Sequence, residues 1–180
     1  MELELASEFG AQFDKKASEF FAQNKKLRDD LQSLSSTEID FMVDQIGREE
    51  SRKIDCTQCA RCCQSFSVGL NSADIQRLAQ HLKLEAYQVR LKYLKKDHEG
   101  DLVFKQRPCA FLKKNCCSVY EGRPQVCRSF PHLHQDRMAG RGWNRVENTL
   151  ICPIVFNTYQ RLREYFHSRQ KMESTMLAES

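Results

Sequence analysis

Apolar residues recur at steps of three, four or seven along the first 34 residues, and charged residues fill the intervals. This spacing is typical of one apolar stripe on an amphipathic helix. The stripe comprises Phe9, Phe13, Phe20, Leu27, Leu31 and Leu34. Ser35 and Glu38 then have the spacing of a capping box, which predicts a second helix that ends near Arg52. We therefore expect a helical hairpin over residues 1–54.

Shorter elements follow the hairpin. Phe66, Val68 and Leu70 alternate with small or polar residues as in a short strand. Asn71 and Asp74 can cap a helix that carries Ile75, Leu78, Ala79 and Leu82, and a further helix is expected over about 85–96. From 97 to 119 the helical period is lost, and a turn and a short strand at 102–104 are expected instead.

A last amphipathic helix is expected after Pro153, where Val155, Tyr159, Leu162 and Phe166 follow at steps of four, three and four. The pattern as a whole predicts a mainly α fold with irregular cysteine-rich segments and a few short strands. The expected organisation is a hairpin over 1–54, a metal-organised cysteine domain over 55–172 and a flexible tail over 173–180.

Composition narrows the class of protein. With 41% hydrophobic and 29% charged residues the chain resembles an ordinary globular domain. No apolar run approaches the roughly 18 residues needed to cross a bilayer, and MELELASEFG lacks the basic residues that open a signal peptide. The net charge is +4, but basic and acidic residues alternate, which argues against a nucleic-acid track. We expect a cytoplasmic protein that binds neither nucleic acid nor membrane.

Nine cysteines are the outlying feature, and none of them lies in the first 55 residues. An odd number, two adjacent pairs and no export signal fit a secreted disulfide framework poorly. Clustered thiols in a reducing compartment indicate metal or redox chemistry instead.

Four cysteines within eight residues, Cys56, Cys59, Cys62 and Cys63, form a C-x2-C-x2-C motif followed directly by a further cysteine. A tight turn between two such cysteines lets both thiolates face one metal. This pattern favours a metal site over a catalytic dithiol or inert core cysteines. If the backbone at Cys62 and Cys63 is extended, their side chains diverge and serve two centres more easily than one.

The second half of the chain supplies Cys109, Cys116, Cys117, Cys127 and Cys152. If one of the adjacent pair is set aside, four remain, and eight thiolates can fill two tetrahedral sites or one cluster plus one mononuclear site. Four arginines lie near these cysteines, where they could offset thiolate charge or form a solvated basic face: Arg61, Arg107, Arg123 and Arg128.

Two segments resemble the YkgJ-type cysteine-cluster family, whose members are described as zinc- or iron-chelating domains. They are CTQCARCC at 56–63 and PCAFLKKNCCSVYEGRPQVCRSFP at 108–131, and the family pattern is CxxCxxCC, PCxFL and CSxYxxRPxxCRxFP. The resemblance implies that the metal ligands are Cys56, Cys59, Cys62, Cys63, Cys109, Cys117, Cys127 and Cys152. It favours Cys117 over Cys116 because Cys117 directly precedes Ser118. The family is also similar to the cysteine-rich part of a flagellin lysine methylase, which implies an iron-sulfur cluster as an alternative cofactor.

The hypothesis is therefore a zinc- or iron-binding protein with no assigned catalytic residue. The alternatives are an iron-sulfur or redox enzyme whose substrate would bind near Tyr120, Arg123 and His132, and a dithiol oxidoreductase, which lacks the usual βαβ context. His132 or His134 could replace a cysteine ligand, or either could be a polar surface residue with no part in metal binding.

A protein partner could bind the N-terminal helices, in which the spacing of apolar residues is nearly heptad. Few long apolar-periodic segments lie between Asp97 and Cys152, so we expect metal to hold that stretch together more than apolar burial does.

Overall fold

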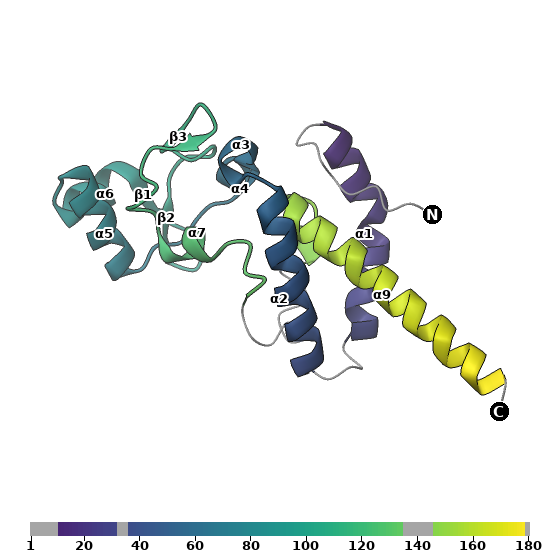
Figure 1. Ribbon diagram of the computed structural model, residues 1–180. Coiled ribbons are helices and arrows are strands. Elements are labelled where there is room, and N and C mark those ends of the chain that lie inside the picture. Colours follow the sequence, from purple (N-terminus) through teal and green to yellow (C-terminus); the bar gives the residue numbers. More distant parts are fainter. Residues whose placement is uncertain (1–10, 32–35, 135–145, 179–180) are drawn as a thin grey trace. The chain divides into compact units, whose positions relative to one another are not determined.

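The computed structural model describes residues 11–31, 36–134 and 146–178 of the chain (Figure 1). These residues are mainly helical and hold two sheets of two strands each, which confirms the predicted fold class. Phe9, Leu34 and Ser35 lie outside the described residues. The elements are α1 (Ala11–Leu31), α2 (Ser36–Lys53), α3 (Cys56–Cys59), α4 (Arg61–Ser65), α5 (Ser72–Leu82), α6 (Ala86–Tyr93), β1 (Leu94–Lys96), β2 (Leu102–Phe104), β3 (Leu112–Lys113), β4 (Cys116–Cys117), α7 (Gln125–Ser129) and α9 (Pro153–Ala178).

The chain divides into two compact units. We call residues 1–54 together with 131–180 the helical unit, and residues 55–130 the cysteine unit. The C-terminal helix α9 therefore belongs with the two N-terminal helices, whereas the sequence pattern had grouped it with the cysteines. It also continues to Ala178 through residues expected to form a flexible tail.

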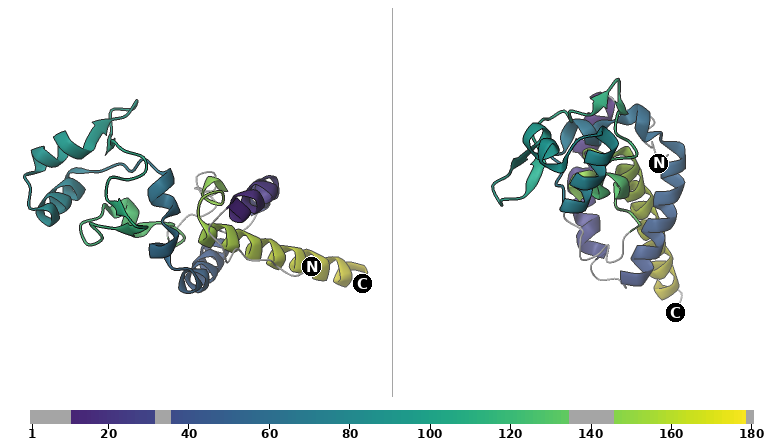
Figure 2. Two further views of the ribbon diagram at one scale, coloured as in Figure 1. Left: turned by 90° about the horizontal axis from the view of Figure 1, so that it is seen from above. Right: turned by 90° about the vertical axis from the view of Figure 1, so that its left-hand side faces the viewer.

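In the helical unit, α1 and α2 both pack on α9 (Figure 1; Figure 2). Every residue from Pro153 to Gln160 is buried, so the first two turns of α9 are enclosed on all sides. The Phe156 ring meets Phe13 and Phe20 of α1 edge to face, with ring centroids 5.7 and 6.0 Å apart. The predicted stripe of α1 thus faces this core, because residues three and four positions apart share one side of a helix.

A buried carboxylate also lies in the helical unit. Glu50 of α2 is 0% exposed and accepts hydrogen bonds from Lys53 at 2.7 Å, from Asn157 at 3.1 Å and from Arg161 at 3.1 Å. Burial opposes ionisation of Glu50, but these donors outweigh it and lower the pKa of its carboxyl group. Glu50 therefore links α2 to α9 as a charged group.

The cysteine unit has an apolar core of its own. Its buried residues are Leu70, Ile75, Leu78, Ala79, Val89, Leu94, Phe104, Phe111 and Val119. Helix α5 begins with the predicted capping box of Asn71 and Asp74. Part of the stretch expected to depend on metal therefore rests on apolar packing, since Phe104, Phe111 and Val119 all come from it.

Two local expectations in the cysteine unit are corrected. Residues 94–96, expected to continue a helix, form strand β1, because Leu94 pairs with Phe104 across an antiparallel hairpin. The strand expected around Phe66–Leu70 is reduced to one bridge between Gly69 and Val103. The strand expected at 102–104 is confirmed as β2.

Candidate metal centre

The first four cysteines lie on a knuckle of two short helices. Asp55 caps α3 by accepting a hydrogen bond from the Thr57 amide at 2.8 Å. Ala60, which is 3% exposed, then turns the chain in the left-handed region at φ 49°, and α4 starts at once. A non-glycine residue in that region costs energy, so the surrounding contacts must hold this turn in place.

The backbone at Cys62 and Cys63 is helical, because both residues lie in α4. Their divergence was inferred from an extended backbone, and that premise is wrong. Instead, the Cys62 thiol hydrogen-bonds to Cys63 and lowers the pKa of Cys63 to about 7, although burial opposes this change. The loss of a proton from Cys63 therefore depends on the thiol of its neighbour Cys62.

A backbone hydrogen bond joins the second set of cysteines to the first, and short secondary-structure elements carry Cys117 and Cys127. The Cys109 amide donates to the Cys63 carbonyl at 2.9 Å, which ties the two halves of the motif together. Cys117 is half-buried in β4, and Cys127 is half-buried in α7. Cys116 is exposed, and its sulfur lies 4.0 Å from the Thr57 carbonyl oxygen.

Charge couples these thiols to one another. Burial is the largest cause of a raised thiol pKa at five positions, which are Cys56, Cys59, Cys109, Cys117 and Cys127. The negative charge of Cys63 raises the pKa further at all five. At Cys127, burial and the charges of Cys63, Cys109 and Cys117 together raise the pKa of the thiol to about 12. Cys63 is therefore the thiol to which α3, β4, α7 and the Cys109 turn are all coupled.

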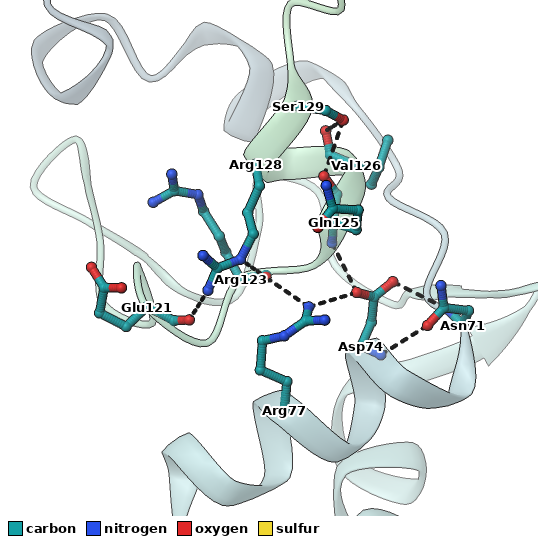
Figure 3. Close-up of polar contacts among 9 residues, drawn as sticks. All are labelled: Asn71, Asp74, Arg77, Glu121, Arg123, Gln125, Val126, Arg128 and Ser129. Atoms are coloured by element: carbon teal, nitrogen blue, oxygen red, sulfur yellow. Dashed lines mark hydrogen bonds and ion pairs between the residues drawn. The ribbon is translucent and has the colours of Figure 1, made fainter.

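The arginines near the cysteines have different surroundings. Arg123 opposes the raised pKa of Cys56, Cys117 and Cys127, so its charge acts on thiols from three elements. Its guanidinium carbon lies 3.5 Å from the centre of the Tyr120 ring. Arg128 instead donates to the backbone carbonyls of Glu121 and Arg123 (Figure 3). Arg61 opposes the raised pKa of Cys59.

Comparison with known proteins identifies a family over the region that holds the nine cysteines. The model of the CxxCxxCC family, described as "Putative zinc- or iron-chelating domain", matches residues 55–153, which is more than half of the chain. The chain belongs to the CxxCxxCC family. The match begins at the first residue of the cysteine unit and extends past the end of that unit.

A curated relative shares part of this region. An uncharacterized protein of Methanocaldococcus jannaschii is 30% identical over 86 residues, which cover 46% of each chain. The chain thus spans about half the length of the curated relative that it matches. No solved structure matches the chain. In the part of the chain that the structure describes, no helix is both long enough and apolar enough to cross a membrane.

The donor set of this CxxCxxCC domain fits zinc or iron in its chemistry, because thiolates are the soft ligands that such ions accept. The side chains of these donors are not close enough together to form a ligand shell. Across residues 11–31, 36–134 and 146–178, no three side chains of His, Cys, Asp or Glu stand together as a group that could hold a metal ion. Binding would therefore have to draw neighbouring thiols closer to each other.

Three further candidates lie in the helical unit. Cys152 is buried just before the start of α9, and its ligation of a metal stays a prediction. His134 contacts a carboxylate, since its Nδ1 lies 2.6 Å from Asp44 Oδ1. His132 lies in the left-handed region at φ 63°. The contact with Asp44 accounts for His134 without a metal.

Proposed function

We propose that this chain binds zinc or iron through the thiolates of its cysteine unit, as one or two metal centres. The observation that carries the proposal is the family match over residues 55–153, within which the Cys109 backbone amide donates to the Cys63 carbonyl at 2.9 Å and joins the two sets of cysteines. The proposed ligands are Cys56, Cys59, Cys62, Cys63, Cys109, Cys117 and Cys127, and Cys152 is proposed from the family pattern.

The electrostatics of the cysteine unit favour a bound cation. Burial and the charge of neighbouring thiolates raise the pKa of five of these thiols, whereas the hydrogen bond from Cys62 lowers the pKa of Cys63 to about 7. A bound cation would replace the protons and remove the repulsion between thiolates. A centre closed by four thiolates has no vacant position for a substrate, so it suits structure, storage or delivery of metal better than hydrolysis.

A second candidate is an iron-sulfur or redox centre that acts on a bound substrate. It is favoured by the Tyr120 ring, which is 49% exposed beneath the Arg123 guanidinium. A planar cation beside the thiols could receive an anionic substrate. Acid-labile sulfide in the purified protein would favour this candidate, and zinc without sulfide would favour the first.

A protein partner on the N-terminal helices is also proposed. Phe41 of α2 is 65% exposed, which leaves a large apolar side chain available for such a contact. Loss of the partner in a Phe41→Ala variant, with unchanged helicity, would support this surface.

The metal proposal is tested by counting protected thiols. The reduced, metal-free chain is titrated with zinc under anaerobic conditions, and unprotected cysteines are alkylated and identified by mass spectrometry. We expect zinc to protect the seven proposed thiols of the cysteine unit and to leave Cys116 reactive. Equal reactivity of all cysteines with and without zinc would contradict the proposal.

A further inference from the structure

Residues 120–130, here called the Cys127 segment, have few apolar side chains in the core of the cysteine unit. In this segment Val126 is 40% exposed and Tyr120 is 49% exposed, so neither side chain enters the core of the cysteine unit. Pro124 is buried, and the Phe130 ring packs against Phe66 with centroids 5.4 Å apart at the far end. Polar contacts must therefore contribute much of the stability that holds α7 against the rest of the cysteine unit.

These contacts converge on one buried carboxylate. Asp74, in the first turn of α5, is 3% exposed. Its Oδ1 accepts hydrogen bonds from the backbone amide of Gln125 at 2.8 Å and from the Arg77 guanidinium at 2.8 Å (Figure 3). The same Arg77 nitrogen reaches the Arg123 carbonyl at 3.5 Å. One acidic side chain thus joins α5 to the first residue of α7 across 51 positions of sequence.

The capping role predicted from the sequence explains only part of this arrangement. Asp74 completes the capping box through Oδ2, which accepts from the Asn71 amide at 3.4 Å. That contact is longer than the two contacts made by Oδ1. A buried carboxylate needs strong partners to offset the loss of water, and Arg77 and Gln125 supply them.

A close backbone approach also brings this segment onto α5. A Cβ atom added at Gly122 would lie 2.7 Å from the Cβ of His81, closer than side chains approach in folded proteins. Only glycine allows the chain to lie so near the helix. Gly122 and Asp74 therefore mark two points at which the Cys127 segment rests on α5.

We propose that Asp74 is a positioning residue for the thiol centre. Its carboxylate fixes the start of α7 on α5, and so it holds the part of the backbone that carries Cys127 in place before any metal is bound. Arg123, whose carbonyl accepts from Arg77, is held by the same contacts. The effect on metal binding rests on the proposed function, whereas the placement of Cys127 does not.

The placement is tested on the reduced, metal-free full chain by timed alkylation with iodoacetamide, with each cysteine followed by mass spectrometry. Cys59 of α3 serves as the reference within the same molecule. In Asp74→Ala we expect Cys127 to react about tenfold faster relative to Cys59, because losing hydrogen bonds to a charged group favours local opening by at least that factor. Equal acceleration of both cysteines would indicate general loss of stability and would overturn the proposal.

Asn71→Ala is the matched control. Asn71 caps the same helix by accepting from the Asp74 amide at 2.8 Å, but the described contacts of its side chain do not extend to the Cys127 segment. We expect the ratio of Cys127 to Cys59 reactivity to change less than about threefold in this variant, because a lost cap acts on α5 as a whole. Asp74→Asn keeps an acceptor for the Gln125 amide and should lie between wild type and Asp74→Ala. An Asn71→Ala ratio as large as that of Asp74→Ala, or no rescue by Asp74→Asn, would overturn the proposal.

A second arm uses zinc alone as the probe, and it measures zinc release to a chromogenic chelator. Asp74→Ala and Cys127→Ser should each speed release by about tenfold, and the double variant should be no faster than Cys127→Ser, because both changes act on one ligand. Additive effects would contradict positioning through Cys127. If the wild-type chain binds no zinc while the alkylation result holds, the metal proposal fails for zinc and the placement of Cys127 stands.

Discussion

Replacing Glu50 by Gln tests whether a buried charge helps to hold the helical unit together. The side chain of Glu50 is 1% exposed, and the substitution keeps its shape while removing its charge. The hydrogen bond from Asn157 can survive, because an amide oxygen still accepts. What is lost is the charged character of the contacts with Lys53 and Arg161.

The expected loss follows from how exposed these partners are. The side chains of Lys53 and Arg161 are 55% and 29% exposed, so both can turn toward water when the carboxylate is gone. The cost is therefore below the roughly 3–5 kcal/mol seen when one partner of a fully buried ion pair is removed. Hydrogen bonds to charged groups contribute about 1 kcal/mol more than neutral ones. Two such contacts give a loss of about 2 kcal/mol in the free energy of unfolding.

Urea denaturation followed by far-ultraviolet circular dichroism measures this loss, because α1, α2 and α9 carry much of the helix. Glu49→Gln is the matched control. Its carboxylate contacts the same Arg161 at 2.6 Å, but it is 47% exposed, so we expect a loss of about 0–1 kcal/mol. A loss below about 0.5 kcal/mol for Glu50→Gln, or equal losses for the two variants, would refute the reasoning.

The pH dependence gives an independent check on Glu50. The pKa of its carboxyl group is lowered in the folded chain from a usual value of 4.5, so the unfolded chain takes up the proton first as pH falls. The stabilisation is complete above about pH 5.5 and is lost as pH falls through the folded pKa. The difference between wild type and Glu50→Gln should therefore shrink in acid. A difference that grows in acid would contradict this sign.

Three further outcomes are expected. Metal affinity should rise with pH, because Cys127, with a pKa of about 12, must lose its proton to bind. Competition titrations at several pH values measure this affinity, and an affinity that does not change with pH would contradict the prediction. Gly122→Ala should lower the free energy of unfolding of the cysteine unit by about 1–3 kcal/mol, because the added Cβ clashes with His81. Gly69→Ala is the control, since no atom lies within 4 Å of its added Cβ, and it should show no loss from such a clash. Phe111→Ala should cost about 3–5 kcal/mol in denaturation, and a cost below 1 kcal/mol would mean that apolar packing does not support the metal-binding stretch.

Helices with a strong apolar period could be predicted from the sequence. Phe13 and Leu27 lie on the buried side of α1, and Tyr159 and Leu162 of the stripe predicted for α9 are buried as well. The capping box at Asn71 was also predictable, because it depends on residues three positions apart. Local periods and caps leave a trace in the sequence that needs no knowledge of distant contacts.

Features that depend on distant partners could not be predicted in this way. Residues Leu94–Lys96 continue an apolar helical pattern, and only pairing with β2 makes them a strand. The placement of α9 with α1 was hidden for the same reason, because it depends on contacts between helices far apart in the sequence. The contact of Asp74 with Gln125 joins residues far apart in sequence, so the short cap pattern concealed it.

The cysteine site was predictable in its residues and less so in its geometry. The C-x2-C spacing indicates a turn, and α3 with the turn at Ala60 provides it. The helical backbone at Cys62 and Cys63 was missed, because adjacent cysteines carry no periodicity of their own. The pKa of Cys63 depends on that local geometry.

Metal content of the full chain, purified without oxygen, tests the central claim most directly. Elemental analysis with acid-labile sulfide counted should find about one or two zinc or iron atoms per chain. Cys116→Ser should retain them, and Cys127→Ser should lose a large part. A wild-type chain with a negligible fraction of a metal atom per molecule, and with all its thiols freely reactive, would contradict the account.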